Sequence, residues 1–156
     1  MTLMRLVLPE ILPDEDRVLW LDVDTIVLKD IGKLFETDLQ DYSLAAVMEP
    51  TRGGRPFRYY NAGVLLMDLG RMRKWQAELV RIVNLRKMDF PDQDAINLRM
   101  QGEILQIGNE WNSCEWTGNH EFAFIRHYAA DRFYWEREGY REYDRDEWRM
   151  KDADED

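Results

Sequence analysis

Residues 17–27 read RVLWLDVDTIV, and this stretch decides the fold class. Its apolar run, VLWL, is bounded by charged residues, which indicates a strand buried on both faces, as in a parallel sheet. Asp22 and Asp24 follow the run with one residue between them. Ligands in open α/β sheets bind at the carboxyl ends of strands, so we expect this pair at a functional site, at the end of a central strand.

Strand and helix patterns alternate along the rest of the chain. Residues 5–12 predict a short helix ended by Pro13, and residues 43–48, 63–67 and 103–107 predict further strands. Residues 51–60, with two glycines and a proline, predict a loop. This alternation predicts an α/β domain with a mostly parallel sheet.

Two longer helices are predicted between these strands. Residues 70–87 form the clearest helical pattern, and the second helix opens at Pro91, with Asp92 as its N-cap, and stops at Gly102. One face of the first helix carries an apolar stripe that indicates core packing: Met72, Trp75, Leu79, Ile82 and Val83.

Length and composition bound the class of protein. The 156 residues, 45% of them hydrophobic, suit one domain, which we place at residues 1–150, followed by an acidic tail at 151–156. The net charge of −10 argues against nucleic-acid binding. A phosphorylated ligand would need a bound cation to offset this charge. The single cysteine, Cys114, excludes an internal disulfide and indicates a reducing compartment, so we expect a cytoplasmic protein, or one peripheral to the inner membrane face.

Four segments could carry chemistry, and each has a structural explanation as well. Asp22 and Asp24 suit Mg²⁺ or Mn²⁺, although strand ends often carry solvated acids. His127 could complete their coordination shell, although a lone histidine is more often structural. Asn61, in YNAGV, could bind sugar hydroxyls or simply form a turn. The acceptor-bearing side chains of PDQD (residues 91–94) favour a helix start, and capping explains one of them.

Taken in order, these segments resemble glycosyltransferase family 8, the retaining group that contains glycogenin and bacterial lipopolysaccharide galactosyl- and glucosyltransferases. The resemblance covers about residues 4–135 and rests on RLVLPEILP, LWLDVDTIV, YNAGVLLMDL, PDQDAIN and HYAADRFYW. It implies an α/β fold of GT-A type, with a mixed, Rossmann-like sheet flanked by helices. It also implies transfer of a hexose, glucose or galactose, from a UDP-sugar donor to a saccharide or other hydroxyl acceptor.

The resemblance also implies roles for individual residues. Asp22, Asp24 and His127 match the family's manganese ligands, and Mg²⁺ is the alternative ion. Gln93 matches the residue on the reacting face of the sugar, where a short-lived ion pair is expected to preserve configuration, and Asp92 is the second catalytic candidate. The remaining positions expected to line the donor and acceptor site, besides the two aspartates and Gln93, are Val23, Glu49, Asn61, Ala62, Asp92, Ala130 and Arg132.

Two features differ from the family pattern. Ala130 stands where the family has glycine, and Phe133-Tyr134 replaces a Lys-Pro pair whose lysine meets the donor phosphates, with Arg132 beside it as a substitute. The family also carries a nucleotide-binding half before the RLVLPEILP helix. We therefore expect an N-terminally truncated fold, weak transfer by this chain alone, and self-association through uncovered apolar surface.

Two other functions fit parts of the sequence. DVDTIV after an apolar strand also fits a haloacid-dehalogenase-like phosphohydrolase, with Asp22 as nucleophile and Asp24 as acid/base, but this leaves YNAGV and HYAAD unexplained. The third hypothesis is a degenerate, non-catalytic domain that binds sugar. Phospho-aspartate trapping would support the first alternative, and sugar binding without manganese-dependent turnover would support the second.

Overall fold

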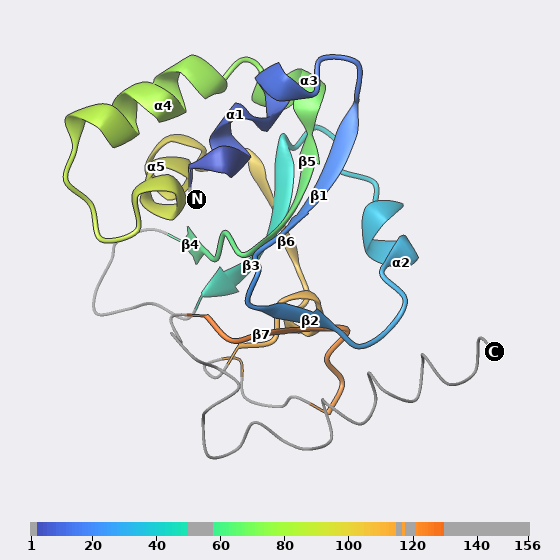
Figure 1. The fold of residues 1–156 in the computed structure, drawn as a ribbon. Helices are drawn as coiled ribbons and strands as arrows, with labels where there is room; N and C mark the ends of the chain where they lie inside the picture. Colours follow the sequence, from blue (N-terminus) through green and yellow to red (C-terminus); the bar gives the residue numbers. More distant parts are fainter. Residues whose placement is uncertain (1–2, 50–57, 115–116, 118–120, 130–156) are drawn as a thin grey trace.

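The computed structural model describes residues 3–49, 58–114, 117 and 121–129. A central sheet carries helices on both faces, and a short two-stranded sheet lies beside one end of it (Figure 1). The elements in chain order are α1 (Met4–Ile11), β1 (Arg17–Leu21), β2 (Thr25–Val27), α2 (Gly32–Phe35), β3 (Leu44–Glu49), β4 (Tyr59–Tyr60), β5 (Val64–Asp68), α3 (Leu69–Met72), α4 (Gln76–Leu85), α5 (Pro91–Arg99), β6 (Ile104–Ile107), the 3₁₀ turn η1 (Asn109–Trp111) and β7 (Ile125–His127).

The predicted strands are confirmed within one residue, but their arrangement differs from a mostly parallel sheet. The strand order is β1-β5-β3-β4, with β6 also paired to β3, and only the β3–β6 pair is parallel among the described strands. Within the described residues β1 pairs with β5 alone, so it is an edge strand rather than a central one. All five of its residues are half-buried, because no further described strand flanks it. The predicted mixed sheet is therefore correct, and the prediction of mostly parallel pairing is wrong.

Successive residues of the central strands point to opposite faces of the sheet, so they pack in separate cores. One core joins Leu44, Ala46, Leu65 and Met67 to the buried faces of α1, α4 and α5. Ala45 and Leu66 point to the opposite face and pack against Leu39. Figure 1 shows α1, α4 and α5 grouped on one side of the sheet and α2 on the other. Described helices thus lie on both faces of the sheet (Figure 1).

The helix predicted over residues 70–87 is two helices, α3 and α4, separated at residues 73–75. The Asp68 carboxylate caps α3 by accepting the Arg71 amide at 2.8 Å. The guanidinium of Arg73 then donates to carbonyls of the α1–β1 connection, including Pro13 O at 2.8 Å. The break thus anchors Arg73 to that connection, and the predicted apolar stripe still packs in or against the core that α1, α4 and α5 cover.

The boundaries of α5 correct one residue. Phe90, not Asp92, occupies the N-cap position, and Asp92 lies in the first turn. The Asp92 carboxylate pairs with Arg5 instead of capping the helix, because a buried carboxylate is stabilised by a nearby cation. Gly102, which was predicted to stop this helix, has a φ of +87°, a conformation that favours glycine, but α5 ends earlier, at Arg99.

Candidate metal centre

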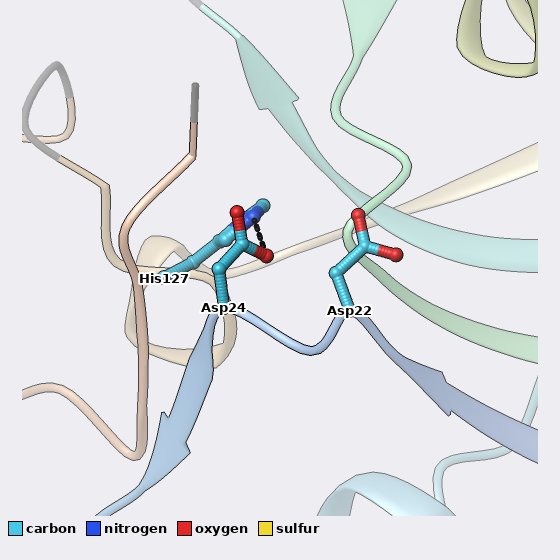
Figure 2. A group of neighbouring side chains, drawn as sticks. All are labelled: Asp22, Asp24 and His127. Carbon is cyan, nitrogen blue, oxygen red and sulfur yellow. Dashed lines mark ion pairs between the residues drawn. The ribbon is translucent and has the colours of Figure 1, made fainter. Parts of the chain in front are cut away.

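The two aspartates lie on a tight turn between β1 and β2. The Thr25 amide donates to Asp22 O at 3.1 Å, and the Thr25 hydroxyl donates to the same oxygen at 2.7 Å. This geometry turns Val23 outward, where 86% of its surface is exposed. The carboxylates of Asp22 and Asp24 project from the same side of the turn (Figure 2). The spacing of one residue therefore brings both carboxylates to one site.

Strand pairing brings His127 to this turn from more than 100 positions further along the chain. In the β2–β7 pair, His127 lies opposite Thr25, and the Tyr128 amide donates to Asp24 O at 2.9 Å. His127 Nε2 lies 3.3 Å from Asp24 Oδ1 (Figure 2). One ligand atom from each of Asp22, Asp24 and His127 lies within 4.8 Å of the others. The three residues therefore form a candidate metal site, as the sequence predicted.

The electrostatics of Asp24 favour its ionised form. Burial by itself would raise the pKa of the carboxyl, but the hydrogen bond and positive charge of protonated His127 hold that pKa below its ordinary value. Asp24 is therefore a carboxylate at neutral pH, which is the form that binds a metal ion.

Asp22 is oriented by two neighbours that the sequence did not single out. Arg5 donates to Asp22 Oδ1 at 2.6 Å, and Trp20 Nε1 donates to the same oxygen at 2.8 Å. The Arg5 guanidinium also lies over the Trp20 ring, 5.0 Å from its centre. Both contacts occupy Oδ1, so the carboxylate is held in one orientation. Arg5 was visible in sequence only as part of RLVLPEILP.

Arg5 links the metal site to α5. Its Nε lies 2.7 Å from Asp92 Oδ2, and both side chains are buried. Burial raises the pKa of Asp92, and the charge of Arg5 only partly offsets this rise. A further Arg5 contact to the Ala62 carbonyl joins this pair to the YNAGV segment. The structure thus assigns Asp92 an ion pair, and its predicted role toward substrate stays a prediction.

The polar residues of YNAGV and PDQD meet in one cluster. Asn61 Nδ2 donates to Glu49 Oε1 at 2.8 Å. Gln93 Oε1 accepts the Ala62 amide at 2.8 Å, and Gln93 Nε2 donates to Tyr59 OH at 3.2 Å. Glu49 is 4% exposed, and its Oε2 has no hydrogen-bond partner among the described residues. The cluster therefore contains one buried carboxylate oxygen without a hydrogen bond among the described residues.

Asn112 is a site residue that the sequence analysis missed. Its Oδ1 lies 2.8 Å from His127 Nδ1, on the ring edge away from Asp24, and its Nδ2 donates to Asn61 Oδ1 at 2.8 Å. Asn112 lies at the end of η1, outside every motif, so no local sequence pattern predicted its role. Cys114 packs beside it, and burial raises the pKa of its thiol. Ala130 and Arg132 lie outside the described residues.

Comparisons with known proteins show which family the chain belongs to. Residues 1–128 match the sequence profile of Glycosyl transferase family 8. The chain belongs to this family. The matched segment includes YNAGV and His127, which the phosphohydrolase hypothesis leaves unexplained.

The chain is also similar to individual glycosyltransferases. It is similar to the glycosyltransferase GlyA of Streptococcus pneumoniae, with 32% identity in an alignment of 137 positions that covers 78% of this chain and 19% of GlyA. The structure resembles that of GlyE from the same organism, with a TM-score of 0.74 and 25% identity over 96% of this chain and 42% of GlyE.

A further resemblance supports the fold. The galactosyltransferase LgtC, solved in complex with donor and acceptor sugar analogues, gives a TM-score of 0.73 at 22% identity, over 97% of this chain and 66% of LgtC. The chain thus spans less than two thirds of each of these relatives. Among the described helices, none combines the length and apolar character that crossing a bilayer requires.

Proposed function

We propose that this family 8 chain carries the metal-binding and sugar-transfer part of a retaining hexosyltransferase that takes glucose or galactose from a UDP-sugar in the cytoplasm. The observation that supports it most directly is the convergence of Asp22 and Asp24, on the turn between β1 and β2, with His127 of β7. The acceptor is a saccharide or another hydroxyl compound.

The donor set suits Mn²⁺ in particular. Carboxylate oxygens suit Mg²⁺, Ca²⁺ and Mn²⁺, whereas imidazole suits softer divalent ions. Two carboxylates with one imidazole therefore favour Mn²⁺ over Mg²⁺, which prefers an all-oxygen shell. The bound ion supplies positive charge that offsets the charge developing on the nucleoside diphosphate leaving group.

The neighbouring polar cluster suits the sugar and the acceptor. Gln93 is held by the Ala62 amide, which leaves a second lone pair on Gln93 Oε1 for the reacting face of the sugar. Glu49 Oε2 is buried and has no hydrogen-bond partner among the described residues. We propose that it accepts a hydrogen bond from a hydroxyl group of the acceptor. Arg5 holds both Asp22 and Asp92, so the metal site and this cluster keep a fixed relation.

The test is donor turnover with a matched pair of variants. Release of UDP from a panel of UDP-sugars is measured with Mn²⁺, with Mg²⁺ and with chelator. Asp24→Asn should reduce Mn²⁺-dependent turnover by roughly tenfold to hundredfold or more, as for loss of a charge-assisted contact. Asp41→Asn, at an exposed aspartate, should leave turnover unchanged.

Gln93→Ala should reduce turnover while Mn²⁺ binding persists, because Gln93 is proposed to meet the sugar and not the ion. Equal turnover with and without chelator would overturn the metal assignment. Mn²⁺ binding with sugar binding but no turnover would instead support the non-catalytic alternative.

A further inference from the structure

We propose that Asn112 is a positioning residue that holds His127 in the tautomer with the proton on Nδ1, so that the lone pair of Nε2 is aimed at the metal site. The inference deepens the proposed function, because it rests on His127 as a metal ligand. It concerns a residue outside every motif of the sequence, and it follows from the direction of a chain of buried hydrogen bonds.

The donor and acceptor roles in this series of hydrogen bonds are set at Asn61. The Gly63 backbone amide, which can only donate, lies 2.8 Å from Asn61 Oδ1. The Glu49 carboxylate, which can only accept when ionised, lies 2.8 Å from Asn61 Nδ2. Either contact alone would orient the Asn61 amide, and both agree. Asn61 therefore presents its oxygen, not its NH₂ group, to Asn112.

The orientation passes from Asn61 through Asn112 to the imidazole. Because Asn61 Oδ1 accepts, Asn112 must place its Nδ2 there, at 2.8 Å. This leaves Asn112 Oδ1 facing His127 Nδ1 at 2.8 Å. A carbonyl oxygen only accepts, so Nδ1 must carry the proton, and in the neutral ring Nε2 then carries a lone pair.

Burial stabilises this series of hydrogen bonds in one orientation. Glu49, Asn61, Asn112 and His127 are all at most 5% exposed. Water has little access to replace a mispaired group, so reversing one amide would leave buried donors facing donors and acceptors facing acceptors. Cys114 Sγ also approaches His127 Nδ1, but at 3.6 Å it is a weaker partner than the Asn112 oxygen at 2.8 Å.

Asp24 works against this tautomer, which is why a positioning residue is needed. Its Oδ1 lies 3.3 Å from His127 Nε2 and would by itself favour a proton on that nitrogen. Such a proton would occupy the electron pair that a metal ion requires. With Asn112 holding the proton on Nδ1, two acceptor atoms face each other, and a cation between them satisfies both. Metal-binding histidines commonly donate their other N–H in this way.

The decisive measurement is the tautomer of His127 in the metal-free chain, by long-range nitrogen–proton correlation NMR of the imidazole. The pH is raised from about 8, above the ordinary imidazole pKa of about 6.5, until the ring is neutral. The wild-type ring should carry its proton on Nδ1. A proton on Nε2 in the wild type overturns the proposal without any variant.

Two variants that touch the same ring nitrogen provide the matched comparison. Asn112→Leu removes the acceptor, so the proton should move to Nε2, and the Kd for Mn²⁺ measured by calorimetry should rise roughly tenfold to hundredfold. Cys114→Ala removes the sulfur contact and should change neither quantity. An Nδ1 proton retained in Asn112→Leu, or lost in Cys114→Ala, would contradict the role of Asn112.

A variant at a second position tests the proposal independently if Asn112→Leu fails to fold. Asn61→Leu frees Asn112 to rotate, so it should also move the proton toward Nε2, and an unchanged tautomer there would count against the chain of bonds. If the wild-type chain holds its proton on Nδ1 yet fails to bind Mn²⁺, the proposed function fails while the tautomer assignment stands. The two failures are therefore distinguishable.

Discussion

Gly63 lies directly against the imidazole of His127. A β-carbon at residue 63 would come within 2.6 Å of His127 Nδ1 and 2.8 Å of Nε2. The Gly63 carbonyl meanwhile accepts the Asp22 amide at 2.8 Å. The same residue therefore aligns the first aspartate through its backbone and makes room for the histidine by lacking a side chain.

Gly63→Ala should weaken Mn²⁺ binding. The added methyl must displace the His127 ring, which is buried and bonded to Asn112, so Nε2 should move out of line with the aspartates. We expect the Kd from calorimetry to rise by at least about tenfold.

Gly102→Ala is the matched control for the glycine change. No atom lies within 4 Å of its β-carbon position, but its φ of +87° makes alanine strained. It should cost about 1–2 kcal/mol of unfolding free energy and leave the Mn²⁺ affinity unchanged. Equal metal affinities in the two variants would refute the close fit between Gly63 and His127.

Metal binding should be visible as thermal stabilisation. Mn²⁺ at about 100 times its Kd stabilises the folded state by about 2.7 kcal/mol. For a chain of 156 residues this corresponds to a rise of roughly 5–10 °C in Tm. Asp24→Asn should abolish the rise, and Asp41→Asn should keep it. A Tm that responds equally in both variants would show that the ion acts elsewhere.

Removal of Arg5 should destabilise the fold far more than removal of Asp92. Arg5→Met leaves the Asp92 carboxylate buried without its cation and frees one side of Asp22, at a cost of about 3–5 kcal/mol. Asp92→Asn removes a charge whose burial Arg5 only partly offsets, and Arg5 keeps Asp22 as a partner, so it should cost less than Arg5→Met. Urea unfolding of the two variants measures this asymmetry, and equal losses would contradict it.

Asp92 should make the folded state less stable as pH rises. Its pKa in the folded state is raised above the unfolded value of about 3.9, so folding favours the protonated carboxyl. The favourable contribution is complete below pH of about 3.9 and is lost as pH rises through the folded pKa. Wild type should therefore lose stability relative to Asp92→Asn as pH rises from about 4. Unfolding curves of both proteins across this range test it, and the opposite trend would mean that the Arg5 pair outweighs burial.

Local patterns were sufficient for much of the fold. The apolar runs placed β1, β3, β5 and β6 within one residue, and Gly102 marked the end of the segment that follows α5. These features depend on neighbours a few positions away. The direction of strand pairing does not, so the sheet was expected to be mostly parallel. The short strands β2, β4 and β7 were not predicted, and β4 (Tyr59–Tyr60) lies inside the segment 51–60 that was predicted to be a loop.

The sequence by itself determined which residues could bind a metal ion. Asp22 and Asp24 lie on one turn, and their common side follows from local geometry alone. Whether His127 reaches them depends on the pairing of β2 with β7, which joins segments about 100 residues apart. The tertiary structure alone decided the roles of Arg5, Gly63 and Asn112. Asn112, for example, contacts Asn61 across 51 positions, and no short-range pattern encodes a hydrogen bond over that separation.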